Sequence, residues 1–217
     1  MMNLFTPLSW NDAGFILAGI LNTVYISLVA IIIGSILGLL VGFIRAESNK
    51  SINVLLGGFL DILRSVPLII QLILFTTFIG AMGYPLNPFV AGSIILSLYT
   101  MAFMSEVFRS GFDSVPENMV KAARSLGMTY LQTVRYVRVP IGMRAVFPSW
   151  LGVALSVRKD SALVSVIGYM ELLRTAEQLI SRTQQPLMIL LGVGLFYFMI
   201  SYPLSRYGKY VERKMEI

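Results

Sequence analysis

Long apolar segments separated by short polar ones dominate this sequence, and their lengths predict how the chain is organised. A helix needs about 20 apolar residues to cross about 30 Å of hydrocarbon. Five segments are long enough to contain such a helix, and they lie within residues 15–44, 52–82, 88–108, 146–167 and 187–204. The alternating pattern of a membrane barrel is missing, and helices are the other way to pair a backbone in lipid. The pattern predicts an all-α, polytopic membrane protein with a single domain over residues 1–217.

The second apolar segment is longer than one helix needs, and it contains Pro67. Proline removes a backbone donor and disfavours helical geometry at the preceding residue, here Val66. We therefore expect this segment to bend at Pro67, with residues 51–63 partly at the inner interface.

Three glycines, Gly34, Gly38 and Gly42, repeat every four residues in the first segment and share one helix face. Small residues at this spacing let helices approach closely in lipid. Packing within the subunit is the preferred interpretation, and a contact between subunits is the alternative.

The basic residues predict the orientation of the helices. With the N-terminus outside and the C-terminus inside, only Arg174 and Arg182 fall in the outer segments. Twelve of the 17 basic residues then fall on the inner side, as the positive-inside rule requires: Arg45, Lys50, Arg109, Lys121, Arg124, Arg135, Arg138, Arg144, Arg206, Lys209, Arg213 and Lys214. These charges flank the apolar segments and form no separate domain, so the net charge of +6 does not indicate nucleic-acid binding.

The sequence contains no Cys and no His, which excludes several kinds of chemistry. Disulfides, thiol nucleophiles, the common zinc sites and histidine acid–base catalysis all require these residues. The chain also has no Gly-x-x-x-x-Gly-Lys-Ser/Thr phosphate-binding loop. We therefore expect no catalytic residue, no metal site and no cofactor bound by this chain, so that any ATP is handled by another polypeptide.

Residues 113–143 form a basic, amphipathic insert between apolar segments, and their pattern predicts two short helices that meet at Gly127. The sequences Ser114-x-x-Glu117 and Thr129-x-x-Gln132 both have the spacing of a capping box. Glycine suits the left-handed residue that closes a helix, and Pro140 follows the second predicted helix.

Small apolar side chains near Gly127 indicate that this insert docks on a partner. Ala122, Ala123 and Leu126 offer an apolar surface, while Lys121 keeps the loop soluble. Such a knob fits the helix-in-groove mode of recognition. The alternative is a basic inner loop that contacts only lipid headgroups.

The spacing of residues 121–140 resembles the cytoplasmic loop of ATP-binding-cassette (ABC) import permeases. The family pattern is Glu-Ala-Ala, three residues, Gly, nine residues and Ile-x-Leu-Pro. Here Lys121 replaces Glu, and Val137 and Val139 replace Ile and Leu. Three further segments are similar to permeases for polar amino acids, and the similarity covers roughly residues 15–210: Arg64-Ser-Val-Pro67-Leu-Ile-Ile-Gln71, Glu106-Val-Phe-Arg109-Ser-Gly111 and Arg158-Lys159-Asp160-Ser161-Ala162-Leu163.

This resemblance implies a type I ABC importer permease fold in a prokaryotic cytoplasmic (inner) membrane. It implies a second permease subunit, identical or paralogous, and two cytoplasmic ATPase subunits that bind ATP-Mg. An extracytoplasmic binding protein would deliver a polar amino acid. The residues implied in coupling to the ATPases are Lys121, Ala122, Ala123, Leu126, Gly127 and Pro140.

Arg158, Lys159 and Asp160 lie near the middle of the fourth apolar segment. A charge at the centre of a bilayer costs about 2.5–3.5 kcal/mol on insertion scales, so these residues need partners or water. Consecutive residues do not share a helix face, so either the helix unwinds around a cavity or each charge has its own partner. The structural alternative is that Arg158 or Lys159 pairs with Asp160 or Asp61.

A substrate pathway is the preferred role for the charges at membrane depth. Asp160 and Glu171 would receive a cationic side chain, with Glu171 lining an outer vestibule. Arg64, Lys159 or an exposed helix N-terminus would meet the substrate carboxylate. The neutral side chains of the set suit glutamine equally well. The candidate substrate-binding residues are Asp160, Glu171, Lys159, Arg64, Ser161 and Gln71.

Three acidic residues also have structural interpretations as partners of an arginine three residues later. The expected pairs are Asp61 with Arg64, Glu106 with Arg109 and, as the alternative to the vestibule, Glu171 with Arg174.

Two rival functions stay open beside an ATP-driven importer for polar, preferably basic, amino acids. A secondary transporter or channel would work without an ATPase and would use a buried carboxylate such as Asp160, but the docking loop would then be unexplained. A lipid-modifying enzyme could use Ser161 with Lys159, although no second element supports it.

Overall fold

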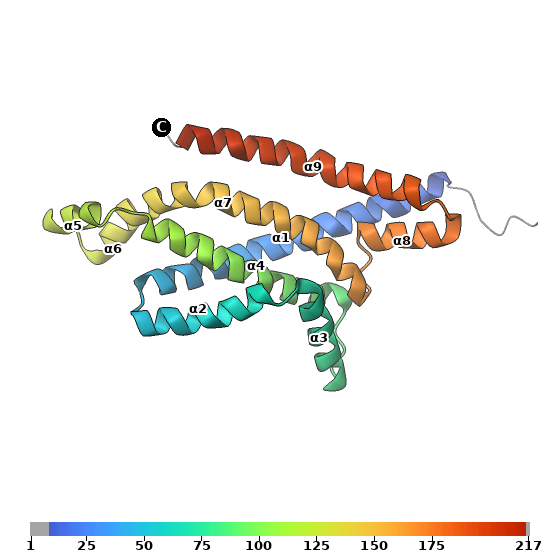
Figure 1. Ribbon diagram of the computed structural model, residues 1–217, viewed down its shortest axis with the longest axis horizontal. Coiled ribbons are helices and arrows are strands. Elements are labelled where there is room, and N and C mark those ends of the chain that lie inside the picture. The colour runs from blue at the N-terminus through green and yellow to red at the C-terminus, as the bar shows by residue number, and fades with distance from the viewer. Residues whose placement is uncertain (1–8, 216–217) are drawn as a thin grey trace, which may run out of the picture. The chain divides into compact units, whose positions relative to one another are not determined.

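The computed structural model describes residues 9–215, and the regular elements within this part are all helical (Figure 1). In chain order they are α1 (Trp10–Glu47), α2 (Lys50–Ser65), α3 (Leu68–Ala81), α4 (Pro88–Asp113), α5 (Glu117–Ser125), α6 (Tyr130–Thr133), the π-helix η1 (Val134–Arg138), α7 (Val139–Asp160), the 3-10 helix η2 (Ser161–Ile167), α8 (Leu172–Thr183) and α9 (Pro186–Met215). The all-α prediction is confirmed.

Four stretches within residues 9–215 are long and apolar enough to cross a membrane, and α2 with α3 makes a fifth, bent one. The bend falls where the sequence predicts it, because α2 ends at Ser65 and α3 begins at Leu68. Pro67 immediately precedes α3, a position at which its missing N–H leaves no helical carbonyl unpaired.

The chain divides into two compact units. Unit 1 contains Met1–Ile31, Val66–Ser97 and Leu155–Leu204, and unit 2 contains Ile32–Ser65, Leu98–Ala154 and Ser205–Ile217. Each of the long helices α1, α4, α7 and α9 contributes one part to each unit.

In unit 2, α1 packs closely on α4 through its glycines. A Cβ added at Gly38 would collide with Met104, and one added at Gly42 would lie 2.7 Å from the carbonyl oxygen of Ser105. Met104 and Ser105 are fully buried. The glycine repeat therefore serves packing within the subunit at Gly38 and Gly42, as preferred above.

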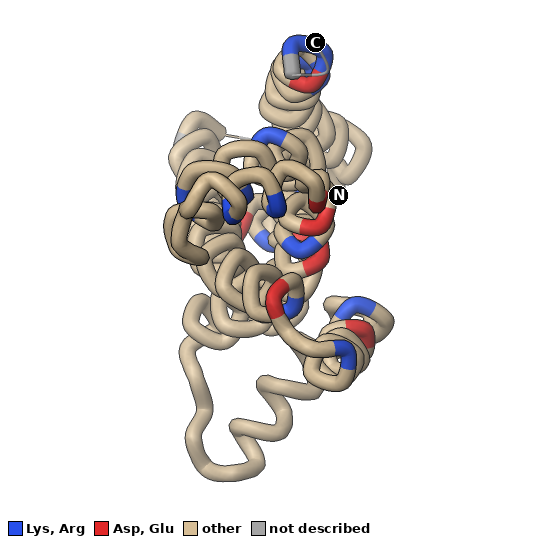
Figure 2. The backbone as a smooth tube through the Cα atoms, turned by 90° about the vertical axis from the view of Figure 1, so that its left-hand side faces the viewer, with Lys and Arg blue, Asp and Glu red and all other residues tan. Residues whose placement is uncertain are grey.

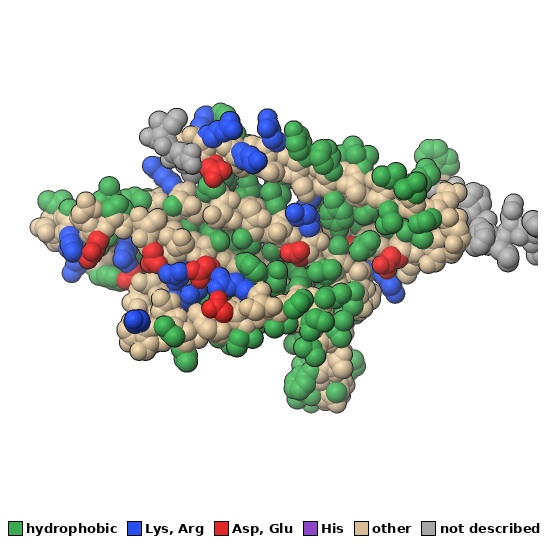
Figure 3. Space-filling model, in the orientation of Figure 1, with side chains coloured by type: hydrophobic (Ala, Val, Ile, Leu, Met, Phe, Trp, Pro, Cys, Tyr) green, Lys and Arg blue, Asp and Glu red, His purple; other side chains and the backbone are tan. Residues whose placement is uncertain are grey.

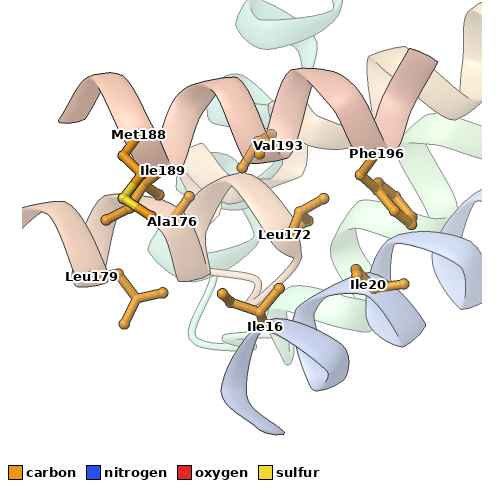
Figure 4. A pocket seen from close by; sticks show the side chains of 10 residues that line it. Ile16, Ile20, Leu172, Ala176, Leu179, Met188, Ile189, Val193 and Phe196 are labelled. Atoms are coloured by element: carbon orange, nitrogen blue, oxygen red, sulfur yellow. The ribbon is translucent and has the colours of Figure 1, made fainter. Parts of the chain in front are cut away.

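In unit 1, the first part of α1 packs against α8. A Cβ added at Gly19 would lie 2.6 Å from Oγ1 of Thr175, and the Asn22 side chain donates to the carbonyl of Met170 at 2.7 Å. Apolar side chains of α1, α8 and α9, including Ile16 and Phe196, line a pocket of about 260 Å³ (Figure 4).

A long uncharged stretch runs through α3 and into α4. Residues 65–105 contain no Asp, Glu, Lys or Arg, and Figure 2 shows α3 and the loop after it in tan alone. Only 6% of the apolar window of α9 is buried within the described chain. These surfaces are suited to lipid or to another apolar protein surface.

Candidate functional site

The first candidate region is the end of α7, where Arg158, Lys159 and Asp160 follow one another. The α-helix continues through Asp160 and then tightens into η2, which ends at Ile167 and is followed by Gly168 with a left-handed φ of 90°. The helix is therefore not unwound at the charges, but it changes geometry directly after them. Separate partners, the other expectation, are what the structure provides for Arg158.

Arg158 is held by α9. Its Nη2 donates to Oγ of Ser201 at 2.7 Å and to the carbonyl of Tyr197 at 3.2 Å, and its guanidinium lies 5.9 Å from the centre of the Tyr197 ring. The side chain of Asp61 pairs with Arg64 instead. Among the described residues of unit 1, neither Arg158 nor Lys159 forms an ion pair with Asp160, so that pairing is wrong. The pairing with Asp61, which belongs to the other unit, stays a prediction.

Asp160 and its neighbours differ in their surroundings. The Asp160 side chain is half-buried and forms no ion pair among the described residues, whereas Lys159 is exposed. Ser161 is fully buried and donates its hydroxyl to the carbonyl of Arg158 at 2.8 Å. A carboxylate in this position is open to a cationic partner from outside the chain.

Gln71 lies on α3 in the same unit. Its Nε2 donates to the carbonyl of Val66 at 2.8 Å and so covers a backbone group at the break between α2 and α3.

Three hydroxyls in unit 1 were missed by the sequence reasoning. Oγ of Ser93, Oγ of Ser97 and the Tyr197 hydroxyl are buried and have no hydrogen-bond partner in the part of the chain described here. A buried polar group without a partner is costly, so these atoms are suited to a polar ligand or to water. The spacing of Ser93 and Ser97, one turn apart on α4, was the available signal.

Glu171 is fully buried and caps α8. Its Oε1 accepts from the backbone N–H of Arg174 at 2.7 Å, and its Oε2 accepts from that of Leu173 at 2.9 Å. Burial raises the pKa of the Glu171 carboxyl to about 7, although the two N–H groups act in the opposite direction. In this conformation the carboxyl is enclosed, so it does not line an open vestibule.

The alternative role of Glu171 in a solvated pair with Arg174 is also wrong. Arg174 Nη1 contacts Oε2 of Glu177 at 3.2 Å. The residue that sequence reasoning missed here is Thr23 on α1, whose Oγ1 accepts from the N–H of Leu172 at 3.0 Å.

Arg64 belongs to a charge cluster in unit 2 that centres on Glu106. Arg45 Nη1 lies 3.0 Å and Arg64 Nη1 lies 3.6 Å from Oε2 of Glu106, while Arg109 pairs with Oε1. Arg64 also pairs with Asp61, so the expected Asp61–Arg64 and Glu106–Arg109 pairs are both confirmed. Figure 3 shows acidic and basic side chains gathered over α2 and the adjoining part of α4. The structure thus gives Arg64 structural partners within its own unit.

The second candidate region is the loop between α4 and α7, in unit 2. Gly127 adopts a left-handed φ of 85° between α5 and α6, as predicted. Leu126 and Leu131 are 85% and 76% exposed, whereas Ala123 is buried. Such exposure of two leucines on a basic loop indicates a surface that a partner covers.

Only one of the two predicted capping boxes forms in this loop. Thr129 and Gln132 cap α6 reciprocally, as the spacing predicts. The prediction for Ser114 and Glu117 is wrong, because the Ser114 hydroxyl donates backwards to the carbonyl of Gly111 at 2.7 Å. Helix α5 begins after Pro116 without a side-chain cap.

The other three coupling candidates are Ala122, Lys121 and Pro140, and Ala122 is exposed. Lys121 is exposed and its Nζ lies 3.0 Å from Oε1 of Glu117. Pro140 does not follow a separate second helix, because α6 continues through η1 into α7. Pro140 is the second residue of α7, and a π-helical turn before it lets the helix pass through a residue without an N–H.

Residues 30–217 match the family described as the binding-protein-dependent transport system inner membrane component. The chain belongs to this family. It is similar to the probable glutamine ABC transporter permease protein GlnM of Bacillus subtilis, with 29% identity over 91% of this chain and 92% of that protein. It is also 29% identical to the arginine transport system permease protein ArtQ of Bacillus subtilis, over 99% of each chain.

Solved structures agree with the family assignment. The chain superimposes on an amino acid ABC transporter crystallised with histidines, with a TM-score of 0.85, 27% identity and coverage of 96% of this chain and 100% of that one. The MetNI methionine transporter, with a TM-score of 0.81 and 19% identity over 96% and 99%, shows the same fold. The ABC importer permease fold and the resemblance are thus confirmed, and the chain is a transport subunit of its family.

Proposed function

We propose that this chain is the membrane subunit of an ATP-driven importer whose substrate is a polar amino acid, either basic or glutamine. The observation that carries the proposal is the loop around Gly127, which presents Leu126 and Leu131 to a partner. The names of the relatives, which refer to glutamine and arginine, support the substrate class.

The implied partners are two cytoplasmic ABC ATPases, a second permease subunit and an extracytoplasmic amino acid-binding protein. The ATPases supply ATP-Mg, since this sequence has no phosphate-binding loop. The nearly unburied apolar face of α9 supports contact with lipid or with the second permease.

Substrate recognition is assigned to unit 1. Asp160, half-buried and without an ion pair among the described residues, would bind the cationic or amide end of the substrate. Ser161, Gln71 and the exposed Lys159 complete the set, together with the unpaired hydroxyls of α4 and α9. Arg64 and Glu171 are engaged by other groups of the chain, so each would have to give up these contacts to meet a substrate.

The proposed site of action is a prokaryotic cytoplasmic membrane, with the N-terminus outside and the C-terminus inside. In this orientation the loop of residues 113–143 faces the ATPases. The concentration of basic residues on the inner segments supports it.

Co-purification from the native membrane tests the proposal. A tagged chain extracted in mild detergent should bring an ABC ATPase with it, and ATP hydrolysis should increase with a basic amino acid or glutamine and the binding protein. Purification of the chain without any ATPase, together with uptake driven by an ion gradient, would favour a secondary transporter instead.

A further inference from the structure

The last residue of α1, Glu47, contacts the loop of residues 113–143, here called the coupling loop, at two points. The Tyr130 hydroxyl donates to Oε2 of Glu47 at 2.5 Å, and Arg138 Nη1 pairs with Oε1. Only 24% of the Glu47 side chain and 26% of the Arg138 side chain are exposed. Both carboxylate oxygens of one residue thus bind a segment that follows 83 or more positions later in the chain.

The two contacts hold a short segment from both ends. Tyr130 is the first residue of α6, and Arg138 is the last residue of η1. The exposed Leu131 lies directly after Tyr130 and is thus part of the segment that Glu47 holds. Nε of Arg138 is buried and has no partner within residues 9–215, so Glu47 is the group that compensates this guanidinium.

The same turn of α1 is fixed to the rest of unit 2. Arg45, two residues before Glu47, is buried, and its Nη1 lies 3.0 Å from Oε2 of Glu106 on α4. Its Nε donates to Oδ1 of Asn53 on α2 at 3.2 Å. The end of α1 therefore has one side chain bound to α2 and α4 and another bound to the coupling loop.

We propose that Glu47 is a positioning residue of the transport cycle, which ties α6 and η1 to α1 so that a displacement of the coupling loop moves this helix. The inference rests on the proposed function, because it requires an ATPase that displaces the loop. A π-helical segment such as η1 is a place where a helix can deform, and without the tie the loop could move while α1 stays still.

The test uses the assembled complex of this chain with its ATPase and binding protein, reconstituted in lipid vesicles. Substrate-stimulated ATP hydrolysis and uptake of the substrate are measured on the same vesicles. Glu47→Gln should keep the hydrolysis but lower the uptake per ATP at least about five-fold, the lower end of typical coupling between sites. The matched control is Glu212→Gln, which removes an exposed carboxylate on α9, outside this loop, and should leave the ratio unchanged.

A charge exchange keeps the inference testable if Glu47→Gln fails to assemble. Glu47→Arg and Arg138→Glu should each lower the uptake per ATP, and the double variant should restore it to within about two-fold of the wild type. A merely structural role would lower hydrolysis and uptake together and leave their ratio unchanged. A wild-type ratio in Glu47→Gln, or a double variant no better than either single one, would overturn the inference. If the wild-type chain recruits no ATPase, the proposed function itself fails, which is a different outcome.

Discussion

Arg45 on α1 and Glu106 on α4 form an ion pair of 3.0 Å, and Arg45 contributes a side chain that is only 6% exposed. Glu106 forms ion pairs with two further arginines, Arg64 and Arg109. One carboxylate thus pairs with three guanidinium groups from helices α1, α2 and α4, of which Arg64 and Arg109 also have acidic partners of their own. Removing it would leave the buried Arg45 without its charged partner, which is costly in an apolar surrounding.

Glu106→Gln should therefore lower the free energy of unfolding by about 1.5–3 kcal/mol, the range for hydrogen bonds to charged groups. Denaturant unfolding of the purified chain in detergent measures this. Asp61→Asn is the control, because Asp61 is 63% exposed and contacts only the rim of the cluster, through Arg64. Exposed pairs contribute about 0–1 kcal/mol. Equal losses in the two variants would contradict the central role of Glu106.

The left-handed turn at Gly127 leads to a prediction about coupling. A β-branched side chain is strained at a φ of 85°, whereas Asn tolerates this region. No atom lies within 4 Å of a Cβ added at Gly127, so backbone strain is the sole local effect of a substitution. Gly127→Val should abolish ATP-driven uptake although the protein still inserts, while Gly127→Asn should retain a measurable rate. Normal uptake by Gly127→Val would show that the turn is not needed for docking.

Asp160→Asn should lower uptake of a cationic amino acid about ten-fold more than uptake of glutamine, corresponding to about 1.4 kcal/mol of differential binding. The reason is that the half-buried carboxylate has no ion pair among the described residues and would supply the negative charge for the substrate. Competition between radiolabelled arginine and glutamine measures the ratio. Glu177→Gln, which removes an exposed carboxylate on α8, is the control. An equal loss of uptake for both substrates would indicate that Asp160 stabilises the fold and does not bind the charge of the substrate.

The raised pKa of the Glu171 carboxyl predicts that the thermal stability of the protein depends on pH. Because burial raises the pKa of this carboxyl from 4.5 to about 7, the native state holds a proton that the unfolded chain releases within this range. The contribution of Glu171 is therefore fully present below about pH 4.5 and is lost as the pH rises through about 7. Thermal unfolding in detergent should show a Tm that falls over this interval. Glu171→Gln should flatten that slope, and an unchanged slope would refute the assignment.

The absence of cysteine permits a direct test of orientation. Ser125 at the end of α5 and Ser181 on α8 are both exposed. With a membrane-impermeant thiol reagent on intact cells, Ser181→Cys should be labelled and Ser125→Cys should be labelled only after the cells are opened. The reverse pattern would place the N-terminus inside.

Apolar length and local backbone chemistry made much of the fold predictable from the sequence. The break at Pro67 and the left-handed turn at Gly127 follow from properties of those residues alone, and both are present. The capping box at Ser114 failed because two local partners compete for one hydroxyl, and the carbonyl of Gly111 is the one that it binds.

Local spacing predicted the pair of Asp61 with Arg64, but it could not predict side-chain partners that are distant in the sequence. Arg158 binds Tyr197 and Ser201, which follow 39 and 43 positions later. Glu171 was expected to line a vestibule, but tertiary packing encloses its carboxyl. Contacts of this kind depend on how distant helices meet, and no periodicity in the sequence encodes them.

Uptake of a labelled amino acid into sealed vesicles tests the central claim most directly. The vesicles hold this chain with its co-purified ATPase, and the binding protein is added outside. Uptake of arginine or glutamine should require ATP inside the vesicles, on the side of the membrane where the ATPase is bound. It should proceed without any ion gradient. Uptake that continues without ATP and follows an imposed ion gradient would contradict an ABC importer and would identify a secondary transporter.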